Sequence, residues 1–480
     1  MQRTHGSPLF ILVLVLALLL TSVASIFSLT TPARAAVSVA GLHVSGNQLL
    51  NGSGQVIRPV GVDRAGTEYE CDASGNTNVF DGPTDITAIN AMLSWDITAV
   101  RLPLNEDCWL GINGYPAGAY TASWYQQTIV NFVNTLTSYN VIVILDLHWN
   151  NSGTNQSNSQ EPMPDLDHAP AFWTSVANTF KGNSSVIFDL YNEPYTKSWS
   201  CWLNGSTAAG ASPCTDVPFA VAGMQTLVNT VRATGATNPI MLGGLAYAND
   251  MSQWLQYEPT DPDHNLIAST HIYNFNACNT VSCWASGIGT IASQVPVIAG
   301  EIGENDCADG FITTLMNWLD QQKIGYLAWA WDTYGCSSFP ALISNYNGTP
   351  TAYGAGFKSH LAALGLGGGA ITPTPSAPGV TITYQSSQWT GGFTANVTIT
   401  NAGTVSYDGW TLQFTFPGDQ HITTMWNGSY TQTGETVTIT NVSYNGTIAG
   451  GQSISFGFQG TWTSNDTSPT TFLFNGASVS

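Results

Sequence analysis

The sequence predicts an α/β protein: a (β/α)8 TIM barrel followed by an all-β sandwich module. Three observations support this. Up to about Leu364, strand-like and helix-like segments alternate. The next stretch, 365–378, is rich in Gly and then in Thr and Pro, as linkers are. Beyond it, short alternating runs such as 393-FTANVTIT-400 lie between Gly and Asn turns, which is typical of a sandwich. We therefore expect a barrel domain over 36–364 and a sandwich module over 379–480.

Eight strand-like runs account for the barrel. They span 57–63, 99–104, 141–149, 185–192, 239–244, 266–273, 297–303 and 325–332. Helical patterns lie between them, for example over 84–95, 124–139 and 311–323. Eight β-then-α units predict a TIM barrel. A doubly wound sheet is the alternative, but no G-x-G-x-x-G motif follows the first strand.

The N-terminus predicts export. Arg3 precedes the apolar run 9-LFILVLVLALLL-20, and 33-ARAA-36 offers a cleavage site of small residues. We expect 1–35 to be a secretory signal that is removed after Ala35. A membrane anchor is the alternative, although the apolar run is short for a full span. No later stretch is apolar enough to cross a bilayer, so the sequence favours a secreted, extracellular protein without membrane contact.

The cysteine count fits this compartment. An even number of cysteines in an exported chain favours disulfide bonds, and sequential pairing would close short loops. The eight cysteines are Cys71, Cys108, Cys201, Cys214, Cys278, Cys283, Cys307 and Cys336. A metal site is the weaker reading, because no C-x-x-C occurs and the cysteines do not cluster with histidines at zinc spacing.

Charge excludes some partners. The chain has 10 Lys plus Arg against 30 Asp plus Glu, a formal net charge of −20. Nucleic acids are bound by cationic neutralisation of phosphates, so a nucleic-acid partner is not expected. Anionic membrane surfaces are disfavoured for the same reason. Only 8% of residues are charged and hydroxyl and amide side chains abound, which suits a neutral, hydroxyl-rich partner.

Polar residues recur where the predicted barrel strands end. In 185-SVIFDLYNEPY-195, a strand that reads as buried ends in a carboxylate, which is costly unless something uses or pairs it. In a barrel, the C-terminal ends of the strands converge on one site. The residues at those ends are Arg101, His148, Asn192, Glu193, His271, Tyr273, Glu301, Trp329 and Trp331.

Two glutamates in one cleft predict glycoside hydrolysis. Glu193 and Glu301 end the fourth and seventh predicted strands, which face each other across an eight-stranded barrel. One carboxyl group can protonate the leaving oxygen while the other attacks or activates water. Nearby charges, including Arg101, can separate the two pKa values as this chemistry requires. No cofactor or metal is needed.

Residues 37–364 resemble the cellulases of glycoside hydrolase family 5. The resemblance rests on 101-RLP-103, 146-DLH-148, 192-NEP-194, 271-HIY-273, 300-GEIG-303 and 328-AWAW-331, in family order. It implies that Glu193 is the general acid/base and Glu301 the nucleophile of a retaining enzyme, with the two carboxyl groups about 5–5.5 Å apart.

The resemblance also implies roles for the other strand-end residues. Asn192 would hold the sugar 2-hydroxyl, and Arg101 and Tyr273 would orient the nucleophile. His148 and His271 would line the cleft, while Trp329 would form an aromatic platform. Trp331 is a second platform candidate.

Two loops depart from the family pattern: 63-DRAGTEYECD-72 after the first strand and 332-DTYGCSSFP-340 after the eighth. Such loops shape the substrate subsites. The resemblance therefore predicts the two catalytic residues, and it leaves the choice of glucan to these loops. Glu304, one turn beyond Glu301, is the rival nucleophile. Four further aromatics could be loop platforms or ordinary core residues; they are Tyr69, Trp109, Trp149 and Trp202.

The last region resembles a family 2 carbohydrate-binding module over nearly its whole length. A strip of three exposed aromatics, which is implied by the resemblance, maps onto Trp389, Trp426 and Tyr444. Trp410 alternates with apolar residues in 409-GWTLQFTF-416 and is predicted to be core. By this resemblance, Val380 and Val479 stand where the family's terminal cysteines usually lie, so we expect no disulfide here.

The leading hypothesis is therefore a secreted, monomeric, retaining endo-β-1,4-glucanase that binds cellulose or a related β-glucan through its module. A mannanase, a xyloglucanase or another β-glycanase is the nearest alternative, since one barrel serves several backbones. A non-catalytic carbohydrate-binding protein is a further alternative, which the two intact glutamates disfavour.

Overall fold

The computed structural model describes residues 37–72, 78–118, 120–337, 339–365, 380–403, 407–475 and 477–479. The predicted signal, 1–35, lies outside these residues, as does the predicted linker except for its first residue. Among the helices of the described part, none is both long and apolar enough to cross a membrane.

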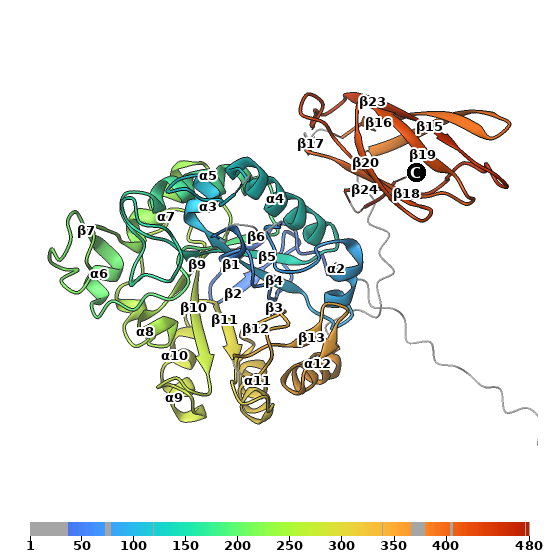
Figure 1. Ribbon diagram of the computed structural model, residues 1–480. Coiled ribbons are helices and arrows are strands. Elements are labelled where there is room, and N and C mark those ends of the chain that lie inside the picture. The colour runs from blue at the N-terminus through green and yellow to red at the C-terminus, as the bar shows by residue number, and fades with distance from the viewer. Residues whose placement is uncertain are drawn as a thin grey trace, which may run out of the picture. The chain divides into compact units, whose positions relative to one another are not determined.

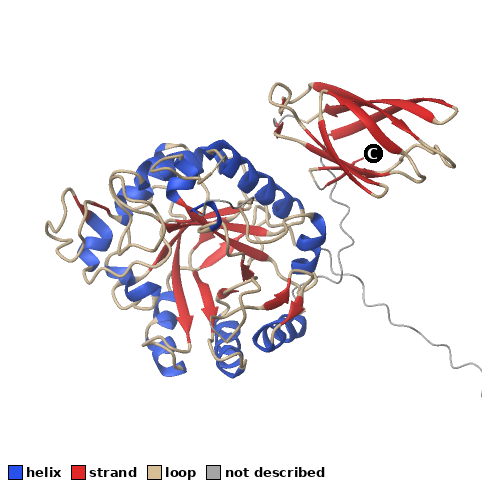
Figure 2. Cartoon of the chain, viewed as in Figure 1, coloured by secondary structure: helices blue, strands red, loops and turns tan. Residues whose placement is uncertain are grey.

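A closed barrel of eight parallel strands confirms the predicted fold class (Figures 1 and 2). Its strands in order around the barrel are β3 (Val60–Asp63), β4 (Ala99–Asn105), β5 (Ile142–Trp149), β6 (Val186–Asp189), β9 (Ile240–Gly243), β10 (Leu266–Tyr273), β11 (Val297–Gly303) and β12 (Gly325–Ala328). The barrel closes where Tyr326 of β12 pairs with Val60 of β3.

Helices follow the strands and cover the outside of the barrel (Figure 2). They are α2 (Ile86–Leu93), α3 (Glu106–Leu110), α4 (Ala122–Ser138), α5 (Ala169–Phe180), α6 (Trp199–Asn204), α7 (Met224–Ala233), α8 (Leu245–Ala248), α9 (Val281–Ser286), α10 (Ile288–Ala292), α11 (Gly310–Gln322) and α12 (Ala352–Leu364), with 3-10 turns η1 (Glu70–Asp72) and η2 (Trp254–Gln256). Small ladders join β1 (His43–Ser45) to β2 (Gln48–Leu50), β7 (Gly205–Ser206) to β8 (Val221–Ala222), and β13 (Ile343–Asn345) to β14 (Thr349–Pro350).

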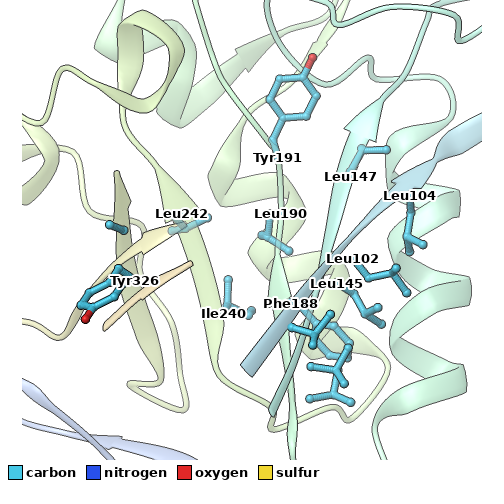
Figure 3. Packing of buried hydrophobic residues seen from close by; sticks show 14 of the residues in the cluster. Leu102, Leu104, Leu145, Leu147, Phe188, Leu190, Tyr191, Ile240, Leu242 and Tyr326 are labelled. Carbon is cyan, nitrogen blue, oxygen red and sulfur yellow. The ribbon is translucent and has the colours of Figure 1, made fainter. Parts of the chain in front are cut away.

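Strand alternation divides the barrel's apolar residues into two cores. Leu145 and Phe188 belong to the outer cluster between the sheet and the helices (Figure 3). Their neighbours Ile144 and Ile187 belong to the inner cluster, together with Leu49 of the β1–β2 hairpin. Successive side chains point to opposite faces of a strand, and here each face packs against one of the two clusters. Both faces are therefore apolar, and the strands read as continuous hydrophobic runs.

Two predicted strand ends were too long. The fourth strand stops at Asp189, not at 192, and the eighth stops at Ala328, not at 332. The chain nevertheless keeps contact with the sheet beyond β6, because the Asn192 amide donates to the Leu147 carbonyl at 3.0 Å. Glu193 therefore stands on the irregular segment just past its strand.

Sequential disulfide pairing is confirmed. The bridges are Cys71–Cys108, Cys201–Cys214, Cys278–Cys283 and Cys307–Cys336. Each joins segments that follow barrel strands, so the bridges hold the loops at the C-terminal end of the barrel, where the predicted site residues lie.

The Cys71–Cys108 bridge is expected to contribute the most stability of the four. Its sequence separation is 37 residues, and the double replacement Cys71→Ser/Cys108→Ser should lower the free energy of unfolding by about 2–4 kcal/mol. The matched control is Cys278→Ser/Cys283→Ser, with a separation of 5, which should cost about 1–2 kcal/mol less because less loop entropy is involved. Urea unfolding measures both, and the reverse order would contradict the expectation.

The C-terminal module is an all-β sandwich, as predicted. One sheet has the order β15 (Val380–Trp389), β16 (Gly392–Asn401), β23 (Ser453–Thr461) and β19 (His421–Trp426). The other has β20 (Ser429–Thr433), β21 (Thr436–Thr440), β18 (Thr411–Thr415), β24 (Phe472–Phe474) and β25 (Ala477–Val479), and β17 (Tyr407–Asp408) pairs with β22 (Thr447–Ile448). Trp410 is 1% exposed, which confirms it as core, and Val380 and Val479 pack in the same core.

Candidate active site

The structure brings the two predicted catalytic glutamates together. Glu193 follows β6, while Glu301 lies within β11. One carboxylate oxygen of each and a ring nitrogen of His271 all lie within 4.8 Å of one another. His271 comes from β10 and is paired with Glu301 in the strand register, directly after an irregularity between Thr270 and His271.

Glu301 is almost completely buried and held at both oxygens. Tyr273 donates its hydroxyl hydrogen to Oε2 at 2.5 Å, and Arg101 Nη1 donates to Oε1 at 2.9 Å. Both contacts fix the direction of the carboxylate. The predicted orienting roles of Arg101 and Tyr273 therefore correspond to direct hydrogen bonds.

Arg101 is the centre of a buried charge network. Besides Glu301, its guanidinium donates to four side chains from the neighbouring strand ends: Asp63 at 3.1 Å, Asp146 at 2.9 Å, Asp189 at 3.1 Å and Asn192 at 2.9 Å. Burial raises the pKa of Asp63 well above its ordinary value and that of Asp189 to about 8. A proton held by Asp189 near neutral pH reduces the excess of negative charge around one arginine.

Glu193 has the surroundings of a general acid. Burial raises its pKa to about 7. Its Oε1 lies 2.9 Å from Nδ1 of His271, whose own pKa burial lowers to about 3, so this imidazole is neutral at working pH. A neutral neighbour leaves Glu193 free to keep its proton, while Glu301 faces the cationic Arg101.

His148 and Trp329 form one wall of the site. Their rings stack with centroids 5.3 Å apart and planes at 19°. Burial lowers the pKa of His148, but Asp146, 2.8 Å from Nδ1, outweighs it and raises that pKa to about 9. The predicted positions of His148, Asn192 and Trp329 beside the catalytic pair agree with this geometry.

Burial corrects one predicted substrate contact and decides two roles that the sequence left open. Trp331 is 1% exposed and packs edge-on against Trp95, so it is a core residue rather than a sugar platform. Trp109 and Trp202 are fully buried and are likewise core. Tyr69 and Trp149 stay half-buried, with ring centroids 6.3 Å apart.

Glu304 is a helix-capping residue. Its buried carboxylate accepts the backbone N–H groups of Phe311 at 2.7 Å and Ile312 at 3.3 Å, in the first turn of α11. Unpaired N–H groups at a helix N-terminus favour such a carboxylate. This local role explains Glu304 without any catalytic function.

Functional candidates that the sequence reading missed are exposed aromatics and one amide. Phe275 is 53% exposed and stacks on Tyr273 at 5.0 Å. Tyr247 is 50% exposed and stacks at 4.9 Å on Tyr195, two residues after Glu193. Gln160 donates to the Glu193 carbonyl at 2.7 Å. Phe275 follows the polar end of β10, a signal that could have found it. Tyr247 follows the apolar strand β9 and Gln160 lies in a loop, so neither has such a signal.

The predicted aromatic strip of the module is exposed. Trp389 is 49% exposed, Trp426 41% and Tyr444 73%. Trp389 pairs with Gly392, and Trp426 pairs with Gly457. A Cβ on either glycine would lie within 2.6 Å of the indole, so each ring lies flat over a glycine.

Strand register places both tryptophans on the same face of one sheet. Gly392 is opposite Thr461, which stands four residues after Gly457 on β23, and residues four apart on a strand share a face. This face is the outer one, because Phe458, next to Gly457, is buried in the module's core. The two exposed rings thus lie on one outer face of the module.

Comparison with known families agrees with this geometry. The family model for cellulase, glycosyl hydrolase family 5, matches residues 62–335. The chain belongs to glycosyl hydrolase family 5. This family 5 domain is followed by a match to the cellulose binding domain model over residues 380–479.

Solved structures share the fold of the family 5 domain at low identity. A β-glucanase from Saccharophagus degradans aligns with a TM-score of 0.50 and 18% identity, covering 68% of this chain and 94% of that one. A hyperthermophilic endocellulase from Pyrococcus horikoshii gives a TM-score of 0.50 and 18% identity, covering 68% and 100%.

Curated relatives match over about a quarter of this family 5 chain. Exoglucanase B of Cellulomonas fimi is 44% identical over 108 residues, 22% of this chain and 10% of that protein. Endoglucanase CelA of Streptomyces lividans is 42% identical over 119 residues, 24% of this chain and 26% of that protein. Chitinase C of Streptomyces lividans is 39% identical over 119 residues, 24% and 19% of the two chains. The chain thus spans only a small part of these relatives.

Proposed function

We propose that this family 5 protein is a secreted, retaining endo-β-1,4-glucanase that is held on cellulose by its C-terminal module. The observation that carries the proposal is the short distance between the two glutamates. Their nearest oxygens lie within 4.8 Å. Retaining enzymes keep their carboxyl groups about 5–5.5 Å apart, whereas inverting enzymes need about 6.5–9.5 Å to admit a water.

The environments of the two glutamates support different roles for them. Glu301 is the nucleophile, because hydrogen bonds from Arg101 and Tyr273 fix the position of both of its oxygens. Glu193 is the acid, because burial raises its pKa to about 7. In the first step, Glu301 attacks the anomeric carbon while Glu193 gives its proton to the glycosidic oxygen, which leaves with the bond electrons. In the second step, Glu193 takes a proton from water, whose oxygen displaces Glu301 from the sugar.

Export and substrate binding are supported by separate features. Four disulfides suit an oxidising compartment. The exposed Trp389 and Trp426 on one sheet face suit stacking on flat sugar rings. We propose a β-1,4-glucan as the substrate, and not another β-glycan, because the chain matches the cellulase and cellulose binding domain models.

Viscosity and reducing ends, followed together on carboxymethylcellulose, test this function. An endo-acting enzyme should lower the viscosity quickly while few ends are formed. Proton NMR of the first products from a cello-oligosaccharide should show the β-anomer before mutarotation. Initial α-anomer would contradict the retaining mechanism, and hydrolysis of mannan or xyloglucan but not of cellulose would contradict the substrate.

A pH profile tests the assignment of Glu193 as the acid. Because its pKa is raised to about 7, Glu193 loses its proton above that pH, and kcat/KM should fall about tenfold per pH unit on the alkaline side. The residual activity of Glu193→Gln should lack this alkaline limb. A wild-type limb that begins near pH 4–5, where an ordinary glutamate titrates, would contradict the assignment.

Trp426→Ala tests the role of the module. Loss of one stacked indole should weaken binding to crystalline cellulose by about tenfold, roughly 1.4 kcal/mol. The measurement is a pull-down isotherm with the full chain carrying Glu301→Gln, so that the substrate is not consumed. The control is Thr431→Ala, an exposed residue on the other sheet. Equal retention of both variants would refute the role of Trp426.

A further inference from the structure

A second cluster of metal-ligand side chains lies outside the catalytic pair. Glu106 opens α3 directly after β4, and Asp165 and His168 lie just before α5. Nδ1 of His168 is 3.9 Å from Glu106 Oε1 and 3.7 Å from Asp165 Oδ1. One ligand atom from each residue lies within 4.8 Å of the others. The three side chains therefore face a common point.

One acid of the cluster is buried without a well-formed hydrogen bond. Glu106 is fully buried, and neither of its carboxylate oxygens has a partner of good hydrogen-bond geometry among the described residues; its nearest polar neighbours are Asp165 and the Asn151 backbone. Asp165 is equally buried. In the described part of the chain, the ion pairs of these two groups involve only His168, and no lysine or arginine. Two adjacent buried acids without a lysine or arginine partner are costly unless a cation or a proton joins them.

We propose that Glu106, Asp165 and His168 bind a first-row divalent transition-metal ion, for which Zn²⁺ is the reference. Two ligand atoms at about 2.0–2.2 Å from a tetrahedral ion lie roughly 3.3–3.6 Å apart. The separations of 3.7 and 3.9 Å need to close by only a few tenths of an ångström. A histidine nitrogen disfavours Ca²⁺ and Mg²⁺, which take oxygen ligands.

Surrounding hydrogen bonds already orient the ligands. Asn150 Nδ2 donates to Asp165 Oδ2 at 2.9 Å, and the His168 backbone N–H donates to Oδ1 at 2.7 Å. His168 Nδ1 lies 3.3 Å from the Asn151 carbonyl oxygen, which can serve as a further oxygen ligand. Such supporting contacts fix ligand direction in metal sites.

The ion would brace the segment that carries the catalytic acid. Asn150, which holds Asp165, accepts the Tyr191 hydroxyl hydrogen at 2.8 Å. The Tyr195 backbone N–H donates to the Pro162 carbonyl at 3.0 Å. Tyr191 and Tyr195 flank Glu193 in sequence, so the cluster is linked to both sides of that residue. The proposed role is structural, and the hydrolytic steps do not involve the ion.

Metal binding to the full chain tests the proposal. The protein is stripped with a chelator, desalted and titrated with ZnCl2 by calorimetry, and its Tm is measured with and without Zn²⁺. Glu193, His271 and Glu301 form the other ligand cluster of the described residues, so the Glu301→Gln variant is the matched control. We expect one Zn²⁺ per chain in the wild type and in Glu301→Gln, and at least tenfold weaker binding in Glu106→Gln. Zn²⁺ should raise the Tm by a few degrees in the variants that bind it and leave the Tm of the other variants unchanged.

Further variants keep the test decisive. His168→Gln should also lose Zn²⁺, and it should fold, because His168 is partly exposed and makes no side-chain cap bond to α5. The control variant Thr174→Ala changes an exposed residue of α5 whose hydroxyl donates to the Pro170 carbonyl, and it should keep Zn²⁺ binding. Zn²⁺ binding that survives both Glu106→Gln and His168→Gln would overturn the proposal, as would no binding by the wild type or tighter binding of Ca²⁺ than of Zn²⁺. Absence of binding would leave a proton shared between Glu106 and Asp165 as the explanation.

Discussion

Replacing Glu301 with Gln is expected to lower kcat on a β-1,4-glucan by about 10⁴-fold or more, since loss of a covalent nucleophile has effects of this size. The amide keeps the shape of the side chain and can still contact Arg101 and Tyr273, so the fold should persist. Initial rates on carboxymethylcellulose and a circular dichroism melt measure the two effects.

Glu304→Gln is the matched control. Glu304 is three residues away and buried, and it contacts only the first turn of α11 among the described residues. Activity should stay near that of the wild type, with a loss of stability of about 0.3–1 kcal/mol from the weakened helix cap. If Glu304→Gln were inactive and Glu301→Gln active, the nucleophile assignment would be wrong.

Azide distinguishes the two glutamates chemically. In Glu301→Ala, azide can occupy the space of the lost carboxylate and attack the sugar directly, so an activated β-glucoside should give an α-glycosyl azide. In Glu193→Ala, azide should instead attack the glycosyl-enzyme formed on Glu301, which gives the β-azide. The product configuration therefore assigns each role independently of the size of the rate loss.

Arg101→Gln is expected to cost about 3–5 kcal/mol of stability and to abolish activity, because it leaves buried carboxyl groups without their cation. The four acids that contact the guanidinium are Asp63, Asp146, Asp189 and Glu301. Urea unfolding at pH 7 measures the loss. The control is Arg58→Gln, which breaks a partly exposed pair with Asp320 and should cost less than about 1 kcal/mol.

The loss of stability caused by Arg101→Gln should become smaller as the pH falls. In the folded variant the carboxyl groups bind protons more readily than in the unfolded chain, and the pKa of Asp189 is already about 8 in the wild type. When the folded-state pKa of a carboxyl group lies above its unfolded-state pKa, the free energy of unfolding falls as the pH rises from the unfolded-state pKa to the folded-state pKa. The stabilisation is therefore fully present at low pH. Equal losses for Arg101→Gln and Arg58→Gln at pH 7 would contradict the central role of Arg101.

Local pattern and chain order were sufficient for much of the architecture. The alternation of apolar strands and helices predicted the barrel, and short separations such as that of Cys278 and Cys283 predicted the disulfides. Glu193 and Glu301 were recognisable because each follows an apolar run that would otherwise exclude a carboxylate. These features depend on residues close together in the sequence.

Burial of large aromatics could not be predicted in this way. Trp329 and Trp331 look equivalent in 328-AWAW-331, yet Trp329 stacks on His148 while Trp331 packs on Trp95. Which of the two tryptophans faces the site depends on where β12 ends and on the position of Trp95, against which Trp331 packs. Glu304 likewise differs from Glu301 only through the start of α11, which takes up its carboxylate.

The order of the strands and helices, the separate sandwich module and the two candidate catalytic acids could be predicted from the amino-acid pattern, because hydrophobic periodicity and turn residues act locally. The sharing of charge among the site residues could not be predicted, because it depends on the folded barrel. Three arrangements join segments that are distant in the chain. They are the four carboxyl partners of Arg101, the neutral His271 beside Glu193, and the cluster of Glu106, Asp165 and His168. Their protonation depends on burial and on neighbours that are brought together only when the barrel closes.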